Sequence, residues 1–290
     1  MDLGVTAMGF VVGVVVGLTG MGGGALMTPL LVLFFNVQPL AAVSSDLVAS
    51  VVMKPVGGSV HLKRGTVNLD LVKWLALGSV PSAFAGVLIL RALGSSDTIQ
   101  DRLKLMLGVA LLVAAAAMAI KRLLDRKREP SFVPVVVKPL PTVAVGVAGG
   151  LIVGMTSVGS GSLMIVLLLA LYPQLTAGQL VGTDLVQAVP LVLSAAIGHL
   201  VFGDFVFAMT ASLLLGSVPG AYVGARVSVR ANDNLIRPIL ITVLSASALK
   251  LLGVPTKVVA VMLLAAAAAG AAAVLVAWRR PAPALQGEVV

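Results

Sequence analysis

The chain has 290 residues, of which 59% are hydrophobic and 11% are charged, and its mean hydropathy is +1.11. These values exclude an ordinary soluble domain and predict an all-α polytopic membrane protein embedded in a lipid bilayer. The net charge of +9 does not indicate nucleic-acid binding, because the basic residues lie in loops between apolar segments, where membrane proteins carry topology signals. The absence of cysteine excludes disulfides and thiol chemistry.

The apolar segments are the first structural signal along the chain. A membrane-spanning helix needs about 20 mostly apolar residues. Two apolar pieces, 24–36 and 161–172, are too short to cross comfortably. No cleavable signal peptide is expected, because Asp2 stands where such a peptide carries basic residues. Nine long spans are predicted, at 3–20, 42–60, 69–90, 102–121, 140–157, 178–200, 204–226, 235–252 and 256–278.

An internal repeat organises these segments. The stretch GLTGMGGGALMTPLL from Gly17 aligns with GMTSVGSGSLMIVLL from Gly154, with eight of 15 positions identical, and the repeat further on pairs Asp46 with Asp184. Each repeat holds about five segments with short, glycine-interrupted helices. The predicted units are an N-terminal repeat (1–121), a basic linker loop (122–139), a C-terminal repeat (140–252), one extra helix (253–278) and a flexible cytoplasmic tail (279–290).

The Lys and Arg residues predict the orientation of the two repeats. If the linker loop is cytoplasmic, most basic residues fall in cytoplasmic loops, which is the asymmetry expected of a membrane protein. The loop HLKRGTVN at 61–68 is basic, whereas its repeat mate HLVFGDFV at 199–206 has neither Lys nor Arg. Equivalent loops are therefore expected on opposite sides. This predicts an inverted-topology repeat, with the N-terminus outside and the C-terminus in the cytoplasm.

Glycines interrupt both repeats at matching positions, 20–24 and 157–161. Paired interruptions in inverted repeats point to a transporter site at the bilayer midplane. Each interruption precedes a short helix whose N-terminal amides and dipole favour an anion. The alternative is that the glycines only permit close helix packing. That interpretation is preferred for the glycine stripe, which is the four-residue spacing of Gly9, Gly13 and Gly17, and for the copy of this stripe in the second repeat.

Few ionisable residues lie within the spans, and each is costly there. Asp46 and Asp184 are interpreted either as acids at helix N-termini or as coupling groups. Lys54 is interpreted either as a counter-charge for an anion or as a side chain that reaches the cytoplasmic surface. His61 and His199 are expected at helix ends, as caps or surface groups or as gating groups.

Polar residues at the interruptions complete the predicted site. Gln187 would face a cavity if its helix bends at Pro190. No Walker loop, H-E-x-x-H motif or nucleophile with a spaced His and acid occurs, so neither an enzyme nor a metal or cofactor site is predicted. The candidates for coupling and gating are Asp46, Asp184, His61 and His199. The candidates for substrate binding are Gly22, Gly23, Gly24, Thr28, Lys54, Gly159, Ser160, Gly161, Ser162 and Gln187.

Three motifs occur in the same order in both halves: GLTGMGGGALMTPLL, SSDLVAS and LGSVPSAFAG, with a weaker second copy after the basic loop. In this respect the chain, from about 5 to 278, resembles the sulfite exporter TauE/SafE family, which includes 4-toluene sulfonate uptake permease-like proteins. The resemblance implies a secondary transporter of the bacterial cytoplasmic membrane that exports sulfur oxyanions or organosulfonates. It carries the glycine-rich motif of the family onto Gly20, Gly22, Gly23 and Gly24 and, in the second copy, onto Gly159, Ser160 and Gly161.

The residues and the resemblance agree on an anion transporter that works by alternating access around the two interruptions. The expected partners are a small sulfite- or sulfonate-class anion and the lipid bilayer. Glycine stripes would suit a homodimer as well as an internal interface. Three alternatives stay open at this point: an anion channel of the same architecture, a membrane scaffold or accessory subunit without transport, and a cation transporter in which Asp46 and Asp184 face the cavity ionised and Lys54 does not.

Overall fold

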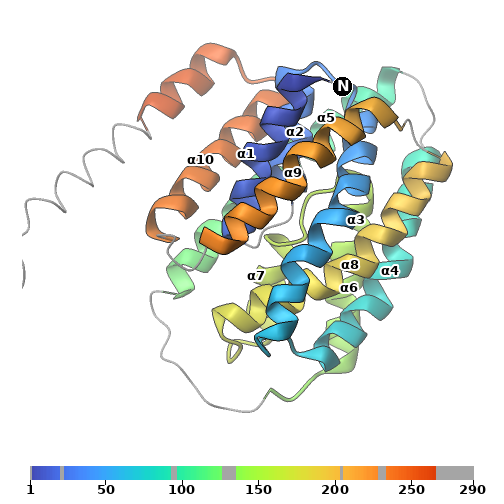
Figure 1. Cartoon of the computed structure of the whole chain (residues 1–290), viewed down its shortest axis with the longest axis vertical. Coiled ribbons are helices and arrows are strands. Elements are labelled where there is room, and N and C mark those ends of the chain that lie inside the picture. Colours follow the sequence, from blue (N-terminus) through green and yellow to red (C-terminus); the bar gives the residue numbers. More distant parts are fainter. Residues whose placement is uncertain are drawn as a thin grey trace, which may run out of the picture.

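A computed structural model describes residues 2–19, 23–92, 97–125, 135–202, 205–227 and 233–265, and every named element in these ranges is a helix (Figure 1). The first half contains α1 (Leu3–Thr19), α2 (Gly24–Phe34), α3 (Pro39–Lys63), α4 (Leu69–Ala92) and α5 (Asp97–Asp125). The second half contains α6 (Pro139–Thr156), α7 (Leu163–Leu171), α8 (Ala177–Phe202), α9 (Phe207–Val227) and α10 (Asp233–Leu251). A further apolar helix covers Thr256–Ala265.

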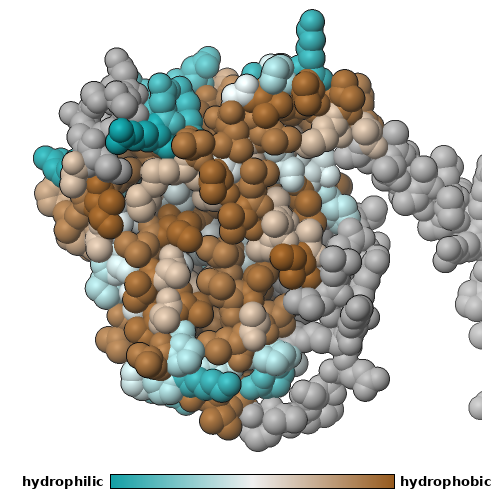
Figure 2. All heavy atoms as spheres, turned by 180° about the vertical axis from the view of Figure 1, so that it is seen from behind, coloured by the Kyte–Doolittle hydropathy of each residue, from teal (hydrophilic) through white to brown (hydrophobic). Residues whose placement is uncertain are grey.

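The all-α polytopic prediction is confirmed. Six helices in the described part of the chain are long and apolar enough to cross a membrane. Figure 2 shows a broad hydrophobic zone around the middle of the molecule with hydrophilic residues at both ends. The other three predicted spans coincide there with shorter apolar helices, so a total of nine long spans stays a prediction. The six long helices are Pro39–Lys63, Leu69–Ala92, Gln100–Ile120, Pro139–Thr156, Gly178–Phe202 and Phe207–Gly224.

The first helix of each half packs against the fourth helix of the other half. A Cβ atom on Gly13 in α1 would overlap the carbonyl oxygen of Ser217 in α9. A Cβ atom on Gly150 in α6 would likewise overlap the carbonyl oxygen of Ser79 in α4. Backbones can approach this closely only where no side chain intervenes. The packing interpretation is therefore confirmed for these two stripe positions.

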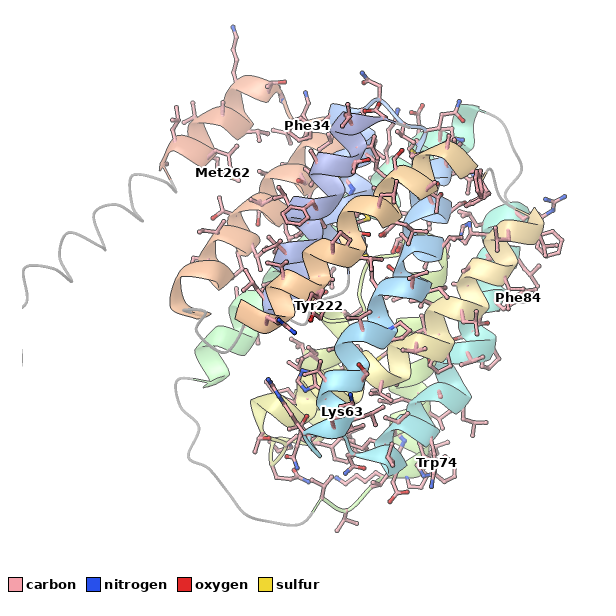
Figure 3. The ribbon with its side chains drawn as sticks, in the orientation of Figure 1. Phe34, Lys63, Trp74, Phe84, Tyr222 and Met262 are labelled. Carbon is pink, nitrogen blue, oxygen red and sulfur yellow. The ribbon has the colours of Figure 1, made fainter. Side chains whose placement is uncertain are left out.

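Helices α1 and α2 form a hairpin, in which α2 brings the chain back to the end of the bundle where α1 begins. Gly4, in the first turn of α1, lies against the ring of Phe35, because a Cβ atom on Gly4 would be 3.1 Å from Phe35 Cε1. Figure 3 shows Phe34 at the same end as the N-terminus marked in Figure 1. At 1.5 Å per residue, the 11 residues of α2 cover only about half of a 30 Å hydrocarbon core.

Helices α6 and α7 form a second hairpin of the same kind. Tyr172, directly after α7, accepts a hydrogen bond from the Lys138 amide (2.8 Å) and contacts the hydroxyl of Thr142 in the first turn of α6. The end of α7 therefore lies beside the start of α6. With nine residues, α7 is also too short to span the core.

Helices α3 and α8 run side by side through the middle of the bundle (Figure 1). A Cβ atom on Gly58 of α3 would lie 3.5 Å from Val186 of α8. Near the other end of the pair, Ser44 of α3 contacts His199 of α8 at 2.9 Å. The two hairpins pack around this central pair. The opposite membrane orientation of the halves and the proposed domain boundaries stay predictions.

The glycine stripe makes a prediction about stability. Gly13→Ala should lower the free energy of unfolding by about 1–3 kcal/mol, because its methyl group collides with the α9 backbone. The matched control is Gly178→Ala, whose Cβ atom would make an ordinary 3.7 Å contact with Thr66 Cγ2. That change should stay within about 1 kcal/mol of the wild type. Thermal unfolding of the purified protein in detergent measures both, and equal melting of the two variants would contradict the packing role.

Candidate functional site

The helix ends match the two predicted interruptions. In the first half α1 ends at Thr19 and α2 begins at Gly24, while Gly20 and Gly22 lie outside the described residues. In the second half α6 ends at Thr156 and α7 begins at Leu163. Neither α2 nor α7 has a side-chain cap on its N-terminal amides. Both short helices thus begin inside the protein with a polar N-terminus.

The second interruption has an irregular backbone that its sequence explains. Ser157 caps α6 in the left-handed region at φ 59°, with its amide bonded to the carbonyl of Val153 at 2.7 Å. Gly159 and Gly161 have φ values of 124° and 90°, which side-chain-bearing residues rarely adopt. The alternation of serine and glycine therefore allows a tight turn and places hydroxyl groups within it.

The two hairpins meet at their tips. A Cβ atom on Gly24 would overlap the carbonyl oxygen of Ser157 and lie 2.8 Å from its hydroxyl oxygen. The N-terminus of α2 therefore packs directly against the C-terminal cap of α6. This contact brings the two predicted interruptions together in one place, although they lie in different halves of the sequence.

Asp46 joins both hairpin tips to α3. Its side chain is 0% exposed, and its Oδ2 atom accepts hydrogen bonds from the hydroxyls of Thr28 (2.9 Å) and Ser157 (2.6 Å). Its Oδ1 atom lies 3.6 Å from the position that a Cβ atom on Gly23 would take. The carboxylate thus sits at the N-terminus of α2, where the helix dipole favours a negative charge.

The interpretation of the two aspartates as acids at the start of their own helices is wrong. Helix α3 begins at Pro39 and α8 at Ala177, so Asp46 and Asp184 lie about two turns inside. Both are buried. Asp46 instead lies at the N-terminus of a different helix, α2, and tertiary packing brings the two together.

Lys54 lies at the second interruption. Its side chain is 5% exposed, and its ammonium group donates a hydrogen bond to the hydroxyl of Ser160. The carboxylates of Asp184 and Asp46 both act on it electrostatically. The alternative in which Lys54 reaches the cytoplasmic surface is therefore wrong. A buried ammonium group, a hydroxyl-rich turn and two carboxylates form the charged centre of the protein.

Two more of the predicted site residues carry buried hydrogen-bond donors. The hydroxyl of Ser162 and the amide nitrogen of Gln187 are buried and have no hydrogen-bond partner among the described residues. The amide oxygen of Gln187 accepts from the hydroxyl of Ser79 in α4 at 3.0 Å. Leaving a buried donor unpaired costs about 1–3 kcal/mol. These donors are therefore candidates for contact with a ligand.

The two histidines occupy different environments and do not meet. His199 is fully buried: its Nε2 atom donates to the carbonyl oxygen of Gly154 (2.9 Å), and its Nδ1 atom lies 2.9 Å from the Ser44 hydroxyl. Its interpretation as a cap or surface group is wrong. His61 is partly exposed at the end of α3 and contacts Thr66 in the following loop at 2.9 Å. A gating role for either histidine stays a prediction.

The comparisons with known proteins agree with this architecture. Residues 5–251 match the sequence profile of the family described as sulfite exporter TauE/SafE. The chain belongs to the TauE/SafE family. The probable membrane transporter protein YjnA of Bacillus subtilis (strain 168) is 38% identical over 256 residues, which cover 87% of this chain and 100% of the relative. The probable membrane transporter protein YdhB of the same organism is 24% identical over 218 residues, or 75% and 86% of the two chains. No solved structure is significantly similar.

Membership of the TauE/SafE family and the names of its relatives indicate a membrane transporter rather than an enzyme. Within this transporter, sequence reasoning missed Ser157 as the partner of Asp46 and Ser79 as the partner of Gln187. The repeat offered a signal for the first: Ser157 aligns with Gly20, so a serine replaces a glycine at the interruption. Ser79 lies in the duplicated LGSVPSAFAG motif, but nothing in that motif indicates that its partner is Gln187 of another helix.

The contact between the hairpin tips predicts different outcomes at two adjacent glycines. Gly24→Ala should lower the free energy of unfolding by about 3 kcal/mol or more, since the backbone of Ser157 leaves no room for a methyl group. Gly23→Ala should cost less than about 1 kcal/mol, because its nearest neighbour, Asp46 Oδ1, would be 3.6 Å away. Thermal unfolding in detergent compares the two. If Gly24→Ala is as stable as Gly23→Ala, the tips do not pack as described.

Proposed function

We propose that this protein is a secondary transporter that exports a small sulfur-containing anion, such as sulfite or an organosulfonate. It works in the bacterial inner membrane by alternating access around an anion site at the hairpin tips. The observation that carries the proposal is the buried hydrogen bond from Lys54 to Ser160 at the second interruption. A buried ammonium group in a membrane protein marks a substrate pathway or a partner of opposite charge.

The charges at the two tips favour the second interruption as the substrate site. The carboxylate of Asp46 contacts both tips, and at the first it also occupies the N-terminus of α2, so an anion would meet a like charge there. At the second, Lys54, Ser160 and Ser162 supply an ammonium group and two hydroxyls, and Gln187 is proposed as a further donor. An oxyanion with three oxygens can accept several such bonds at once.

The placement of Lys54 also favours an anion over a cation. The cation alternative required that the two aspartates face the cavity ionised and that Lys54 does not face it. Instead Lys54 lies in their electrostatic field, where it offsets one of the two negative charges. A metal cation at the same centre would compete with the ammonium group for the carboxylates.

The hairpins support an inverted repeat with alternating access. The α1–α2 hairpin enters from the end of the bundle that carries Phe34, and Lys63 and Trp74 lie at the opposite end (Figure 3). Helices α1 and α6 each pack on the fourth helix of the other half. Two hairpins that enter from opposite sides and touch at their tips would allow each tip to open towards its own side.

The efflux of sulfite from proteoliposomes tests the proposal. The vesicles contain the purified protein and are loaded with sulfite. Lys54→Met should slow efflux roughly tenfold or more, because loss of a charged hydrogen bond is worth about 1.5–3 kcal/mol. The matched control is Lys73→Met, which changes an exposed lysine paired with Asp70 and should leave the rate unchanged. The same efflux rate in both variants, with sulfite and with isethionate, would contradict the proposed site.

The same vesicles distinguish a transporter from a channel. The anion flux through a transporter saturates as the anion concentration rises. Anion on the opposite side accelerates this flux, since a loaded carrier returns faster than an empty one. A channel shows a flux that rises with the gradient without such acceleration. Absence of any sulfite or sulfonate flux from folded protein would leave the scaffold alternative.

A further inference from the structure

Helix α3 holds the second interruption at two points with side chains of opposite charge. Asp46 accepts a hydrogen bond from Ser157 at 2.6 Å, and Lys54 donates one to Ser160. Asp46 also accepts from Thr28 of α2 at 2.9 Å. A single carboxylate oxygen therefore connects the N-terminal hairpin, the central helix and the C-terminal hairpin. Any movement of segment 157–160 away from α3 has to break both contacts.

The other oxygen of this carboxylate is free among the described residues. Asp46 Oδ1 is buried and has no hydrogen-bond partner among the described residues. A buried, ionised carboxylate normally uses both oxygens as acceptors, because an unsatisfied charged oxygen is costly. A proton on Oδ1 would remove the charge. It would also weaken the two bonds at Oδ2, since hydrogen bonds to an ionised acceptor are roughly twice as strong as neutral ones.

The charges around Asp46 link this proton to the substrate. With all three groups ionised, Asp46, Asp184 and Lys54 carry one net negative charge. An anion bound at Lys54 adds a second negative charge to the same buried centre, and this favours the uptake of a proton there. By reciprocity, a bound proton favours the anion by the same factor.

The groups of other elements that face Asp46 are neutral, or they act on it only through another residue. From α2 and segment 157–160 the described neighbours are hydroxyl and backbone groups. Lys54 comes from its own helix, and Asp184 of α8 acts on that lysine. His199 bonds to Ser44, two residues before Asp46. Asp46 is therefore the carboxylate in contact with both hairpins.

We infer that Asp46 binds a coupling proton that the protein takes up together with its substrate anion, an inference that rests on the proposed function. The anion draws Lys54 away from Ser160, and the proton weakens the bond between Asp46 and Ser157. The two events release the same segment from α3. The segment is released fully only when both ligands are bound, so the loaded protein changes its access faster than the empty one and the two ligands move together.

A proton fits this place better than a sodium ion. Sodium requires several oxygen ligands around a cation-sized space, whereas Asp46 Oδ2 is already engaged with two hydroxyl hydrogens at 2.6 and 2.9 Å. A proton needs only the uncommitted Oδ1 atom.

The test measures anion binding and proton uptake together on the purified full-length protein in weakly buffered detergent solution. The probe is isethionate, because a sulfonate stays ionised near neutral pH and any proton taken up belongs to the protein. The wild type should take up about one proton per bound anion, so its apparent Kd should rise by up to about tenfold per pH unit. Asp46→Asn, which keeps the shape of the side chain, should bind with an affinity independent of pH.

Two controls separate coupling from folding. Asp70→Asn removes an exposed carboxylate paired with Lys73 and should behave as the wild type. Thermal unfolding shows whether Asp46→Asn is folded, and the proton uptake of the wild type tests the inference without any variant.

Other results of this experiment would overturn either the inference alone or the proposed function as well. Isethionate binding without proton uptake, or with a requirement for sodium, overturns the inference alone. Proton uptake that persists in folded Asp46→Asn assigns the proton elsewhere and also overturns it. If the wild type binds neither isethionate nor sulfite at any pH, the proposed function fails, and the inference fails with it.

Discussion

The structure depends on one constraint: a helix that stops halfway across a bilayer has no water to satisfy its terminal amides, so the protein itself has to do so. Both short helices begin inside the protein, where this constraint applies. At the first, Gly24 packs against Ser157 and the carboxylate of Asp46 lies at the start of α2, where the helix dipole favours its charge. The glycine-lined helix pairs and the central pair of α3 and α8 form the protein surroundings that make this arrangement possible.

The two halves share a scaffold but differ in their chemistry. The positions that build the scaffold, such as Gly13 and Gly150, are occupied by glycine in both repeats. The positions that carry charge or hydrogen bonds have diverged: Val192 stands at the repeat position of Lys54, and Ile165 at that of Thr28. Both hairpin tips therefore contact the carboxylate of Asp46, but the second also contacts the ammonium group of Lys54. This difference gives a symmetric frame the distinct places that we propose for an anion and a proton.

Much of the frame could be predicted from the sequence, because it follows from local patterns. Hydropathy gave the membrane class, and consecutive glycines marked the helix interruptions to within a few residues. The interpretations that were wrong concern residues whose partners lie far along the chain. Asp46 was expected to serve its own helix but serves α2, and His199 was expected near a surface but bonds to Gly154 inside the bundle.

By itself, the sequence determined that the chain lies in a bilayer, that its halves are copies and that two helices break at matching points, because apolar length and glycine spacing act over a few turns. Only the tertiary structure decided that both breaks meet at Asp46 and that Lys54 binds Ser160. The three contacts join residues 18, 111 and 106 positions apart. A buried polar group takes whichever partner the packing of the helices brings within hydrogen-bond distance.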